Sequence, residues 1–169
     1  MTVEWYTPAD VVDAVRAVLG YIDLDPASSA AANEVVRAER FFTEADDGLA
    51  QQWNGRVFLN PPWGSMTSLF VEKLLHHYAA GDVPEAILLC AVRTDARWFQ
   101  PLFDHHICFL RGRIKFWAPG ETRNQPPNGC CVVYLGPDPA RFNAIFSGLG
   151  AVVTRVKADV LEDVVGNAV

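Results

Sequence analysis

The chain has 169 residues, half of them hydrophobic, and a formal net charge of −6. This length suits one domain with a sizeable core, and the negative charge argues against a sequence-blind nucleic-acid binder held mainly by phosphates. The first residues lack a basic stretch followed by an apolar one, and no apolar run approaches roughly 18 residues, so we expect a cytoplasmic protein that binds no membrane.

The first predicted element is a helix. The stretch Thr7-Pro8-Ala9-Asp10 offers a threonine as N-cap, a proline at the first helical position and an acid in the first turn. Valines and a leucine then recur at helical spacing until Gly20. A short strand is expected at 21–24, closed by Asp25-Pro26, and the alanine-rich stretch 27–40 is expected to be partly helical.

The rest of the chain alternates strands with helices. In chain order we expect a strand at 57–59, a helix at 66–80, a strand at 86–92, a helix at 96–103, strands at 106–110, 114–117 and 130–135, a helix at 139–149 and a strand at 151–156. Segments 114–117 and 130–135 are expected to pair across the loop between them. Such alternation predicts a three-layer α/β fold with a mainly parallel sheet, in which ligands bind beyond the carboxyl ends of the strands.

The cysteines and histidines show no metal-ligand spacing. Cys90, Cys108 and the adjacent Cys130-Cys131 lie mostly in apolar surroundings and are typical of reduced core residues. The histidines form two adjacent doublets, whose side chains cannot easily point the same way. We therefore predict no metal site.

The predicted strand 57–59 ends in Asn60, Pro61, Pro62 and Trp63. An aromatic amine is a poor nucleophile because its lone pair is delocalised into the ring. The Asn60 side-chain oxygen and the Pro61 carbonyl can each accept one N–H of such an amine, which turns the lone pair toward an electrophile. The two proline rings stiffen this backbone, and Trp63 offers a flat face on which a base can stack. The four residues therefore predict a preorganised hydrogen-bonding site.

Asn-Pro-Pro followed by an aromatic residue is also the signature of methyltransferases that use S-adenosylmethionine to methylate the exocyclic amine of adenine. Five segments together resemble the phage-type DNA N-6-adenine methyltransferases: EWYTP at 4–8, DLDPAS at 23–28, NPPWG at 60–64, RTDARWF at 93–99 and RGRIKF at 111–116. The resemblance implies a Rossmann-like S-adenosylmethionine-dependent methyltransferase fold and methylation of adenine N6 in DNA. Residues 1–169 are expected to form a single methyltransferase domain, without a separate target-recognition domain.

The resemblance also implies which residues bind S-adenosylmethionine. In chain order they are Trp5, Thr7, Pro8, Asp23, Asp25, Asp46 and Asp47. Asp25, with Asp23 as a second candidate, matches the acid that faces the amino group of the cofactor. The start of the first helix suits the carboxylate of the cofactor. Asp47 or Asp46 is expected to hold the adenine amine of the cofactor, with an ordinary acidic loop as the open alternative.

The cofactor half departs from the family pattern. Residues 25–33 contain no glycine, whereas related enzymes carry a glycine-bearing loop at this place. The short distance in sequence from Asp25 to Asp46 leaves little room for a second strand that ends in a ribose-binding acid. We therefore expect an abbreviated cofactor half.

Residues 93–123 carry a net charge of +3, while the rest of the chain carries −9. The residues expected to bind substrate DNA are Arg93, Arg97, Arg111, Arg113, Lys115 and Phe116. The cations can contact phosphates, and Phe116 or Trp117 can stack on the face of an extruded base opposite Trp63. An inward-packing strand at 114–117 is the open alternative. Because base flipping costs a few kcal/mol, single-stranded or locally opened DNA is the expected substrate.

Two further functions remain open from the sequence. A protein glutamine methyltransferase also needs to activate a weakly nucleophilic amide, and it would accommodate the acidic charge. The glycine-free motif and the shortened cofactor half suggest, alternatively, a catalytically inactive protein that binds cofactor or DNA. The target sequence and the oligomeric state do not follow from the residues.

Overall fold

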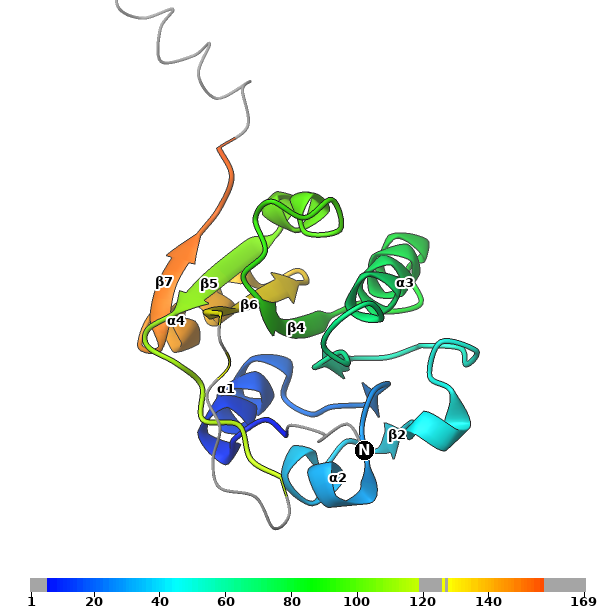
Figure 1. The fold of residues 1–169 in the computed structure, drawn as a ribbon. Coiled ribbons are helices and arrows are strands. Elements are labelled where there is room, and N and C mark those ends of the chain that lie inside the picture. The colour runs from blue at the N-terminus through cyan, green and yellow to red at the C-terminus, as the bar shows by residue number, and fades with distance from the viewer. Residues whose placement is uncertain (1–5, 119–125, 127, 157–169) are drawn as a thin grey trace, which may run out of the picture.

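The computed structural model describes residues 6–118, 126 and 128–156. In this part of the chain, one sheet has the strand order β2-β1-β3-β4-β6-β5-β7 (Figure 1). The strands are β1 (Leu24–Asp25), β2 (Arg40–Phe41), β3 (Val57–Leu59), β4 (Ala86–Ala91), β5 (His106–Leu110), β6 (Cys130–Leu135) and β7 (Gly150–Val153). The helices are α1 (Ala9–Leu19), α2 (Ala30–Val36), α3 (Thr67–Ala80) and α4 (Pro139–Phe146), with 3-10 turns η1 (Glu44–Asp46) and η2 (Gln100–Asp104).

The sheet is parallel in its first part and antiparallel in its second. Strands β2, β1, β3 and β4 pair in parallel, whereas β4, β6, β5 and β7 pair in antiparallel fashion. The expected pairing of 114–117 with 130–135 is wrong. Both edges of β6 are occupied by the apolar strands β4 and β5, and Trp117 forms an isolated antiparallel bridge with Tyr6 instead.

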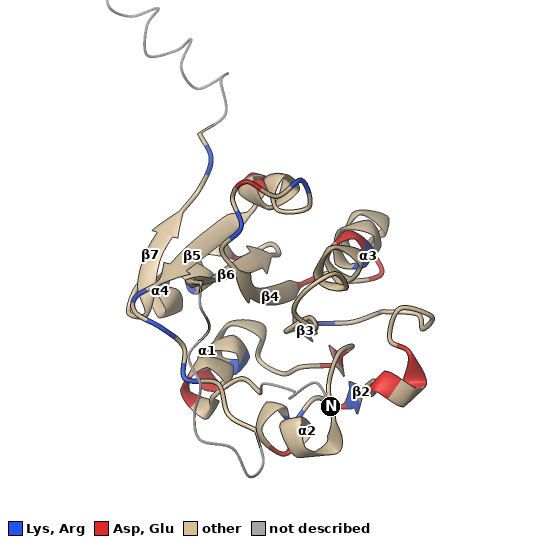
Figure 2. Ribbon diagram, in the orientation of Figure 1, with Lys and Arg blue, Asp and Glu red and all other residues tan. Residues whose placement is uncertain are grey.

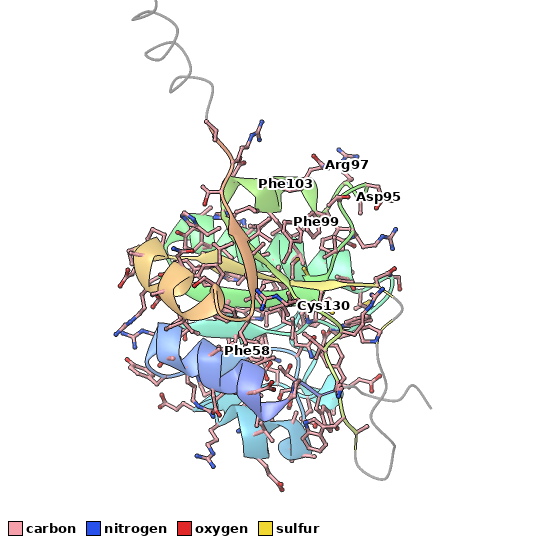
Figure 3. All side chains as sticks on the ribbon, turned by 90° about the vertical axis from the view of Figure 1, so that its left-hand side faces the viewer. Phe58, Asp95, Arg97, Phe99, Phe103 and Cys130 are labelled. Atoms are coloured by element: carbon pink, nitrogen blue, oxygen red, sulfur yellow. The ribbon has the colours of Figure 1, made fainter. Side chains whose placement is uncertain are left out.

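Helices cover both faces of the sheet, and β4 shows how its side chains separate the two cores. Ile87 and Leu89 pack with α1, α2 and α4, whereas Leu88 and Cys90 pack with α3 and η2. This alternation follows from the two-residue period of a strand, and a strand covered on both faces is apolar throughout. Figure 3 shows the three layers from the side, with Phe58 toward α1.

Helix α1 begins later than its sequence suggests. Its N-cap is Pro8, which has extended backbone angles and no side-chain acceptor. Thr7 therefore precedes the cap, and the prediction that it caps the helix is wrong. The buried valines of α1 pack on the sheet as their spacing predicts.

The cofactor half contains a very short β-α-β unit. Strand β1, the seven-residue helix α2 and the two-residue strand β2 are complete within residues 24–41. The predicted helix at 96–103 is largely replaced by turns that lead into η2. Within the described residues, no helix combines the length and the apolar character needed to cross a membrane.

Candidate active site

The carboxyl ends of the parallel strands meet at one edge of the sheet, the carboxyl edge. Strand β1 ends at Asp25, and β3 leads directly into Asn60. Strand β4 leads into Arg93 through Val92, whose N–H donates to the Gly129 carbonyl ahead of β6 at 2.8 Å. This edge is where ligands bind in open α/β sheets, so the structure places the predicted amide and the predicted acid on the expected side.

The Asn60 side chain is held by a residue far away in the sequence. Its Nδ2 donates a hydrogen bond to Thr7 Oγ1 at 3.2 Å. Asn60 is half-buried and Thr7 is buried. The amide is therefore anchored through its nitrogen, the atom that the proposed chemistry does not use.

The backbone after Asn60 is fixed by the start of α3. Thr67 Oγ1 donates to the Pro62 carbonyl at 2.8 Å, and the Thr67 N–H donates to the Gly64 carbonyl at 3.3 Å. Gly64 has φ +111°, a conformation that L side chains rarely adopt. Pro61 is buried, while Trp63 keeps 42 % of its surface exposed. Residues 60–63, the NPPW turn, thus present an aromatic face beside a rigid backbone.

The Phe116 ring packs against the Trp63 ring. The two rings meet edge to face, with centroids 5.5 Å apart and an interplanar angle of 83°. Phe116 and Ile114 are buried, whereas Arg113 and Lys115 are exposed. The expectation that Phe116 and Trp63 sandwich a base is thus corrected, because the two rings already touch. Inward packing and exposed cations coexist here, since alternate residues face opposite sides.

A small cavity lies beside the turn. It measures about 150 Å³ and is lined by Pro61, Trp63, Cys90, Trp98 and Asn128, among others. Cavities that enclose a whole drug-sized ligand measure roughly 300–1,000 Å³. This cavity therefore suits a single planar ring system better than an entire cofactor.

Asp25 is a buried carboxyl group at the end of β1, with 3 % of its surface exposed. The Ala27 N–H donates to its Oδ1 at 3.3 Å. Burial raises the pKa of Asp25 to about 7, although the Ser28 hydroxyl and the Ala27 N–H oppose this rise. No described lysine or arginine forms an ion pair with Asp25. A cation bound here would stabilise its charged form.

The acidic loop after β2 is packed against the end of β1. A Cβ at Gly48 would lie 2.1 Å from the Pro26 carbonyl oxygen, so only glycine permits this approach. Trp53 is buried, and its Nε1 donates to the Gly48 carbonyl at 2.8 Å. The loop is therefore an anchored part of the carboxyl edge.

Asp46 and Asp47 have different surroundings in this loop. The Asp46 carboxylate accepts from the Thr43 N–H at 2.8 Å and from Thr43 Oγ1 at 2.7 Å, and these bonds lower its pKa. Asp47 has a positive φ of 51°, and among the described residues its carboxylate accepts only from the Leu49 N–H at 3.2 Å. Since the Asp46 carboxylate is engaged in a capping box, Asp47 is the better candidate for binding a ligand.

Asp23 lies at the other end of the sheet. Its Oδ2 accepts from the Arg56 N–H at 2.6 Å, ahead of β3, whereas Asn60 follows β3. Asp23 therefore lies ahead of β1 and contacts the chain at the amino ends of the strands, whereas Asp25 lies at their carboxyl ends. Trp5 lies outside the described residues.

The basic residues form two separate groups. Arg111, Arg113 and Lys115 line one groove of about 690 Å³ together with the start of α1 and Trp117. Figure 2 shows these cations along the segment that leads from β5 past α1.

Arg93 and Arg97 form the second group. Arg93 lines the small cavity and forms an ion pair with Asp95 at 3.5 Å. Arg97 lies with Asp95 on the outer side of the loop before η2 (Figure 3), and it lines neither the groove nor the cavity. The structure thus brings Arg93 to the NPPW turn and leaves Arg97 apart from it.

Comparison with known proteins identifies the family. A family model described as DNA N-6-adenine-methyltransferase (Dam) matches residues 2–142. The chain belongs to the DNA N-6-adenine-methyltransferase (Dam) family. The range shared with the Dam family includes the NPPW turn, Asp25, the acidic loop and the basic groove. No curated protein and no solved structure matches the chain.

Sequence reasoning missed two features of the candidate site of this Dam-family chain, and one further candidate residue. The Thr7–Asn60 contact joins residues 53 positions apart, and no local pattern reports it. Asn128 lines the small cavity from a loop without a motif. Glu44 is the first acid after β2, and its position about 20 residues after Asp25 matches the spacing of ribose-binding acids in dinucleotide folds. That spacing was a signal available in the sequence.

Proposed function

We propose that this Dam-family protein transfers a methyl group from S-adenosylmethionine to the N6 amine of adenine in DNA. The observation that carries the proposal is the Asn60-Pro61 pair, anchored at the carboxyl edge beside the exposed ring of Trp63. The family match supports adenine in DNA as the substrate. Protein glutamine would use the same acceptor pair, but it leaves the groove of Arg111, Arg113 and Lys115 without a role.

The donor groups along this edge fit the cofactor. S-adenosylmethionine supplies an electrophilic methyl group on a sulfonium centre. Asp25 is the partner for its ammonium group, because a buried acid with a raised pKa gains most from a cation. Asp47 is the partner for its adenine amine, and Glu44 for its ribose. The first-turn N–H groups of α1, which no side chain caps, suit its carboxylate.

Asn60 and Pro61 activate the amine of the target base. Each oxygen accepts one N–H of the amine, which withdraws the nitrogen lone pair from the ring and directs it at the methyl carbon. Transfer would form the N–C bond and break the bond between the methyl carbon and sulfur, whose electron pair would stay on sulfur as a neutral thioether. The target nitrogen would then carry one proton too many, which it would release to solvent along an accepted N–H. The turn contains no general base, so its contribution is alignment and hydrogen bonding.

The DNA strand is proposed to follow the basic groove to the turn. Arg111, Arg113 and Lys115 contact phosphates, while the target base stacks on Trp63 next to the small cavity. Arg93, at the cavity wall, is placed to contact the phosphate of the target nucleotide. Single-stranded DNA avoids the cost of unpairing the base and is the preferred substrate of this proposal.

A methylation assay with radiolabelled S-adenosylmethionine tests the proposal. The purified protein is incubated with single-stranded and duplex DNA, and the DNA is digested to nucleosides. We expect label in N6-methyldeoxyadenosine and more of it from single strands. Label on a protein glutamine would identify that side chain, and not DNA, as the substrate. Binding of S-adenosylmethionine without transfer to any acceptor would identify a protein that binds the cofactor but is inactive.

Asn60→Ala separates the proposed mechanism from contaminating activity. Removal of one preorganised hydrogen-bond group lowers kcat by about 10²–10³-fold in comparable sites, and we expect a similar loss here. Asn143→Ala is the matched control, since it removes an exposed amide from α4. Equal rates for the two variants would contradict the assigned role of Asn60.

A further inference from the structure

Thr7 lies directly behind the Asn60 amide. The hydroxyl oxygen of Thr7 accepts from Asn60 Nδ2 at 3.2 Å, and only 3 % of Thr7 is exposed. Because Thr7 is neither the cap of α1 nor a solvent-facing residue, its hydroxyl has a different task from the one its sequence suggests.

The backbone of Thr7 is itself held from the opposite side. Trp117 Nε1 donates to the Thr7 carbonyl at 3.3 Å. Next to it, the Tyr6 N–H donates to the Trp117 carbonyl at 2.8 Å, and the Trp117 N–H donates to the Tyr6 carbonyl at 3.2 Å. The Tyr6 and Trp117 rings also meet edge to face, with centroids 5.0 Å apart. Thr7 is thus fixed between Trp117 on one side and Asn60, at the end of β3, on the other.

We propose that Thr7 is a positioning residue for adenine methylation, which anchors the Asn60 amide so that its oxygen faces the substrate amine. This inference rests on the proposed function of the same site. A terminal amide rotates about a broad, roughly two-fold torsion, and rotation exchanges its acceptor for its donors. An amide turned the wrong way presents N–H groups to an amine that must donate, which blocks activation.

The Thr7 hydroxyl acts on the amide in two ways. It fixes the plane of the amide by binding its nitrogen, and by accepting from Nδ2 it polarises the amide so that the oxygen becomes a better acceptor. Reacting groups lose rate steeply with small displacements. Thr7 therefore affects the chemical step through Asn60, and it contributes little to cofactor affinity.

Thr7→Val and Thr7→Ser test this role kinetically. Valine has nearly the shape of threonine but no hydroxyl, whereas serine keeps the hydroxyl. We expect Thr7→Val to lower kcat about threefold to tenfold, the equivalent of one neutral hydrogen bond, with an unchanged KM for S-adenosylmethionine. Thr7→Ser should restore most of kcat. Thr154→Val is the control, because it removes a hydroxyl bonded to His106 Nδ1 at 2.7 Å beyond β7.

A raised KM with unchanged kcat in Thr7→Val would overturn the inference, since it would make Thr7 a cofactor contact. Failure of Thr7→Ser to restore kcat would also overturn it. Neither result would affect the identity of the substrate.

A second measurement does not depend on activity. In nuclear magnetic resonance spectra of the ¹⁵N-labelled wild-type chain, assigned with Asn60→Ala, the Asn60 side-chain amide protons should show a nuclear Overhauser effect to Thr7. In Thr7→Val one of these protons should shift upfield as its hydrogen bond is lost, and Thr7→Ser should retain the wild-type position. Unchanged Asn60 resonances in Thr7→Val would overturn the inference even if DNA methylation is confirmed. If DNA is not the substrate, the spectra still decide whether Thr7 anchors the amide.

Discussion

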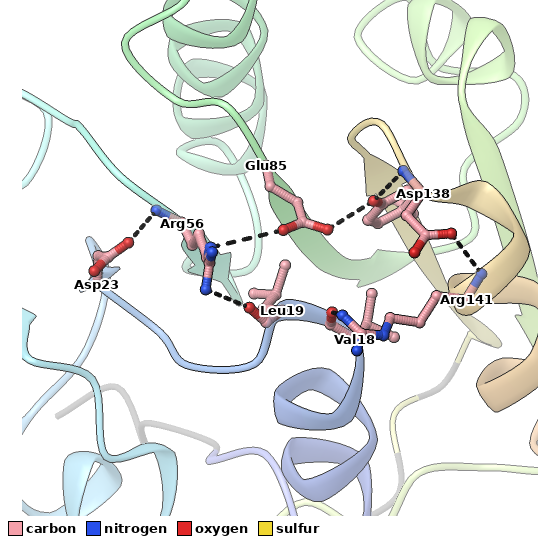
Figure 4. A network of polar contacts seen from close by, with 8 residues as sticks. Val18, Leu19, Asp23, Arg56, Glu85, Asp138 and Arg141 are labelled. Carbon is pink, nitrogen blue, oxygen red and sulfur yellow. Dashed lines mark hydrogen bonds and ion pairs between the residues drawn. The ribbon is translucent and has the colours of Figure 1, made fainter.

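The two ends of the parallel strands differ in how their polar groups are satisfied. At the amino ends, side chains from four parts of the chain form a continuous set of polar contacts (Figure 4). Its members are Val18, Leu19, Asp23, Arg56, Glu85, Tyr134, Asp138 and Arg141. At the carboxyl ends, Asp25 is buried without a described basic partner, and the Trp63 ring is partly exposed.

The polar contacts at the amino ends contribute to stability, whereas the carboxyl ends carry the candidate site. Arg56 illustrates the amino end, because its guanidinium donates to the Leu19 carbonyl at 2.9 Å and lies 3.8 Å from a Glu85 oxygen. Each of the eight residues named above has a polar partner among the others, which favours folding. A buried acid without a cation costs folding free energy, and such costs are typical of sites that bind a ligand. Under the proposed function, the ammonium group of a bound cofactor would offset this cost at Asp25.

The largest expected effect is the pH dependence of stability that Asp25 imposes. In the folded chain the pKa of Asp25 is about 7, against an ordinary value of 3.8 for an exposed aspartate. Between these values the unfolded chain releases the proton while the folded chain retains it, so the free energy of unfolding falls as pH rises from about 4 to 7. At 1.36 kcal/mol per pKa unit, the fall reaches roughly 2–4 kcal/mol.

Urea unfolding at pH 5 and pH 8 measures this effect in wild type and in Asp25→Asn. The asparagine variant should lose much of the pH dependence and be the more stable protein at pH 8. The same slope in both proteins would show that Asp25 has a satisfied charge in the folded state, and the contrast between the two ends would fail.

The next effect concerns cofactor affinity, for which Asp25 and Asp23 form a matched pair. A hydrogen bond to a charged group is worth about 1.5–3 kcal/mol, so Asp25→Asn should weaken S-adenosylmethionine binding by roughly 10–100-fold in titration calorimetry. Asp23→Asn should leave the affinity unchanged, because Asp23 bonds to the Arg56 N–H at the amino end. If both variants bind equally well, Asp25 is not the partner of the ammonium group.

Sequence patterns predicted the features that are local in the chain. The apolar strand 57–59 and the NPPW turn after it are written in consecutive residues, and the buried face of α1 follows from helical spacing. The turn also carried the family resemblance, which the family match then confirmed.

Features that depend on tertiary contacts could not be predicted in the same way. The partner of Asn60, the pairing of β6 and the contact of Phe116 with Trp63 each join segments far apart in sequence. Asp23 and Asp25 illustrate the limit, since two residues in one motif lie toward opposite ends of β1. The register of β1 against β3, with Leu24 opposite Val57, places Asp23 at the amino ends of the strands and Asp25 at their carboxyl ends.

The smallest expected effect concerns Tyr134, whose hydroxyl lies at the amino ends of the strands. Tyr134 is buried, and its hydroxyl donates to Glu85 Oε1 at 2.7 Å and accepts from the Asp138 N–H at 2.9 Å. Burial and the Glu85 bond raise the pKa of Tyr134, so the hydroxyl stays protonated and remains a donor. Tyr134→Phe removes both bonds without changing the ring that stacks on Phe142. We expect about 1 kcal/mol less free energy of unfolding in urea, with kcat and the affinity for S-adenosylmethionine unchanged. A drop in kcat without a loss of stability would mean that the two ends are coupled, because a side chain that reaches only the amino edge would then be controlling chemistry at the other.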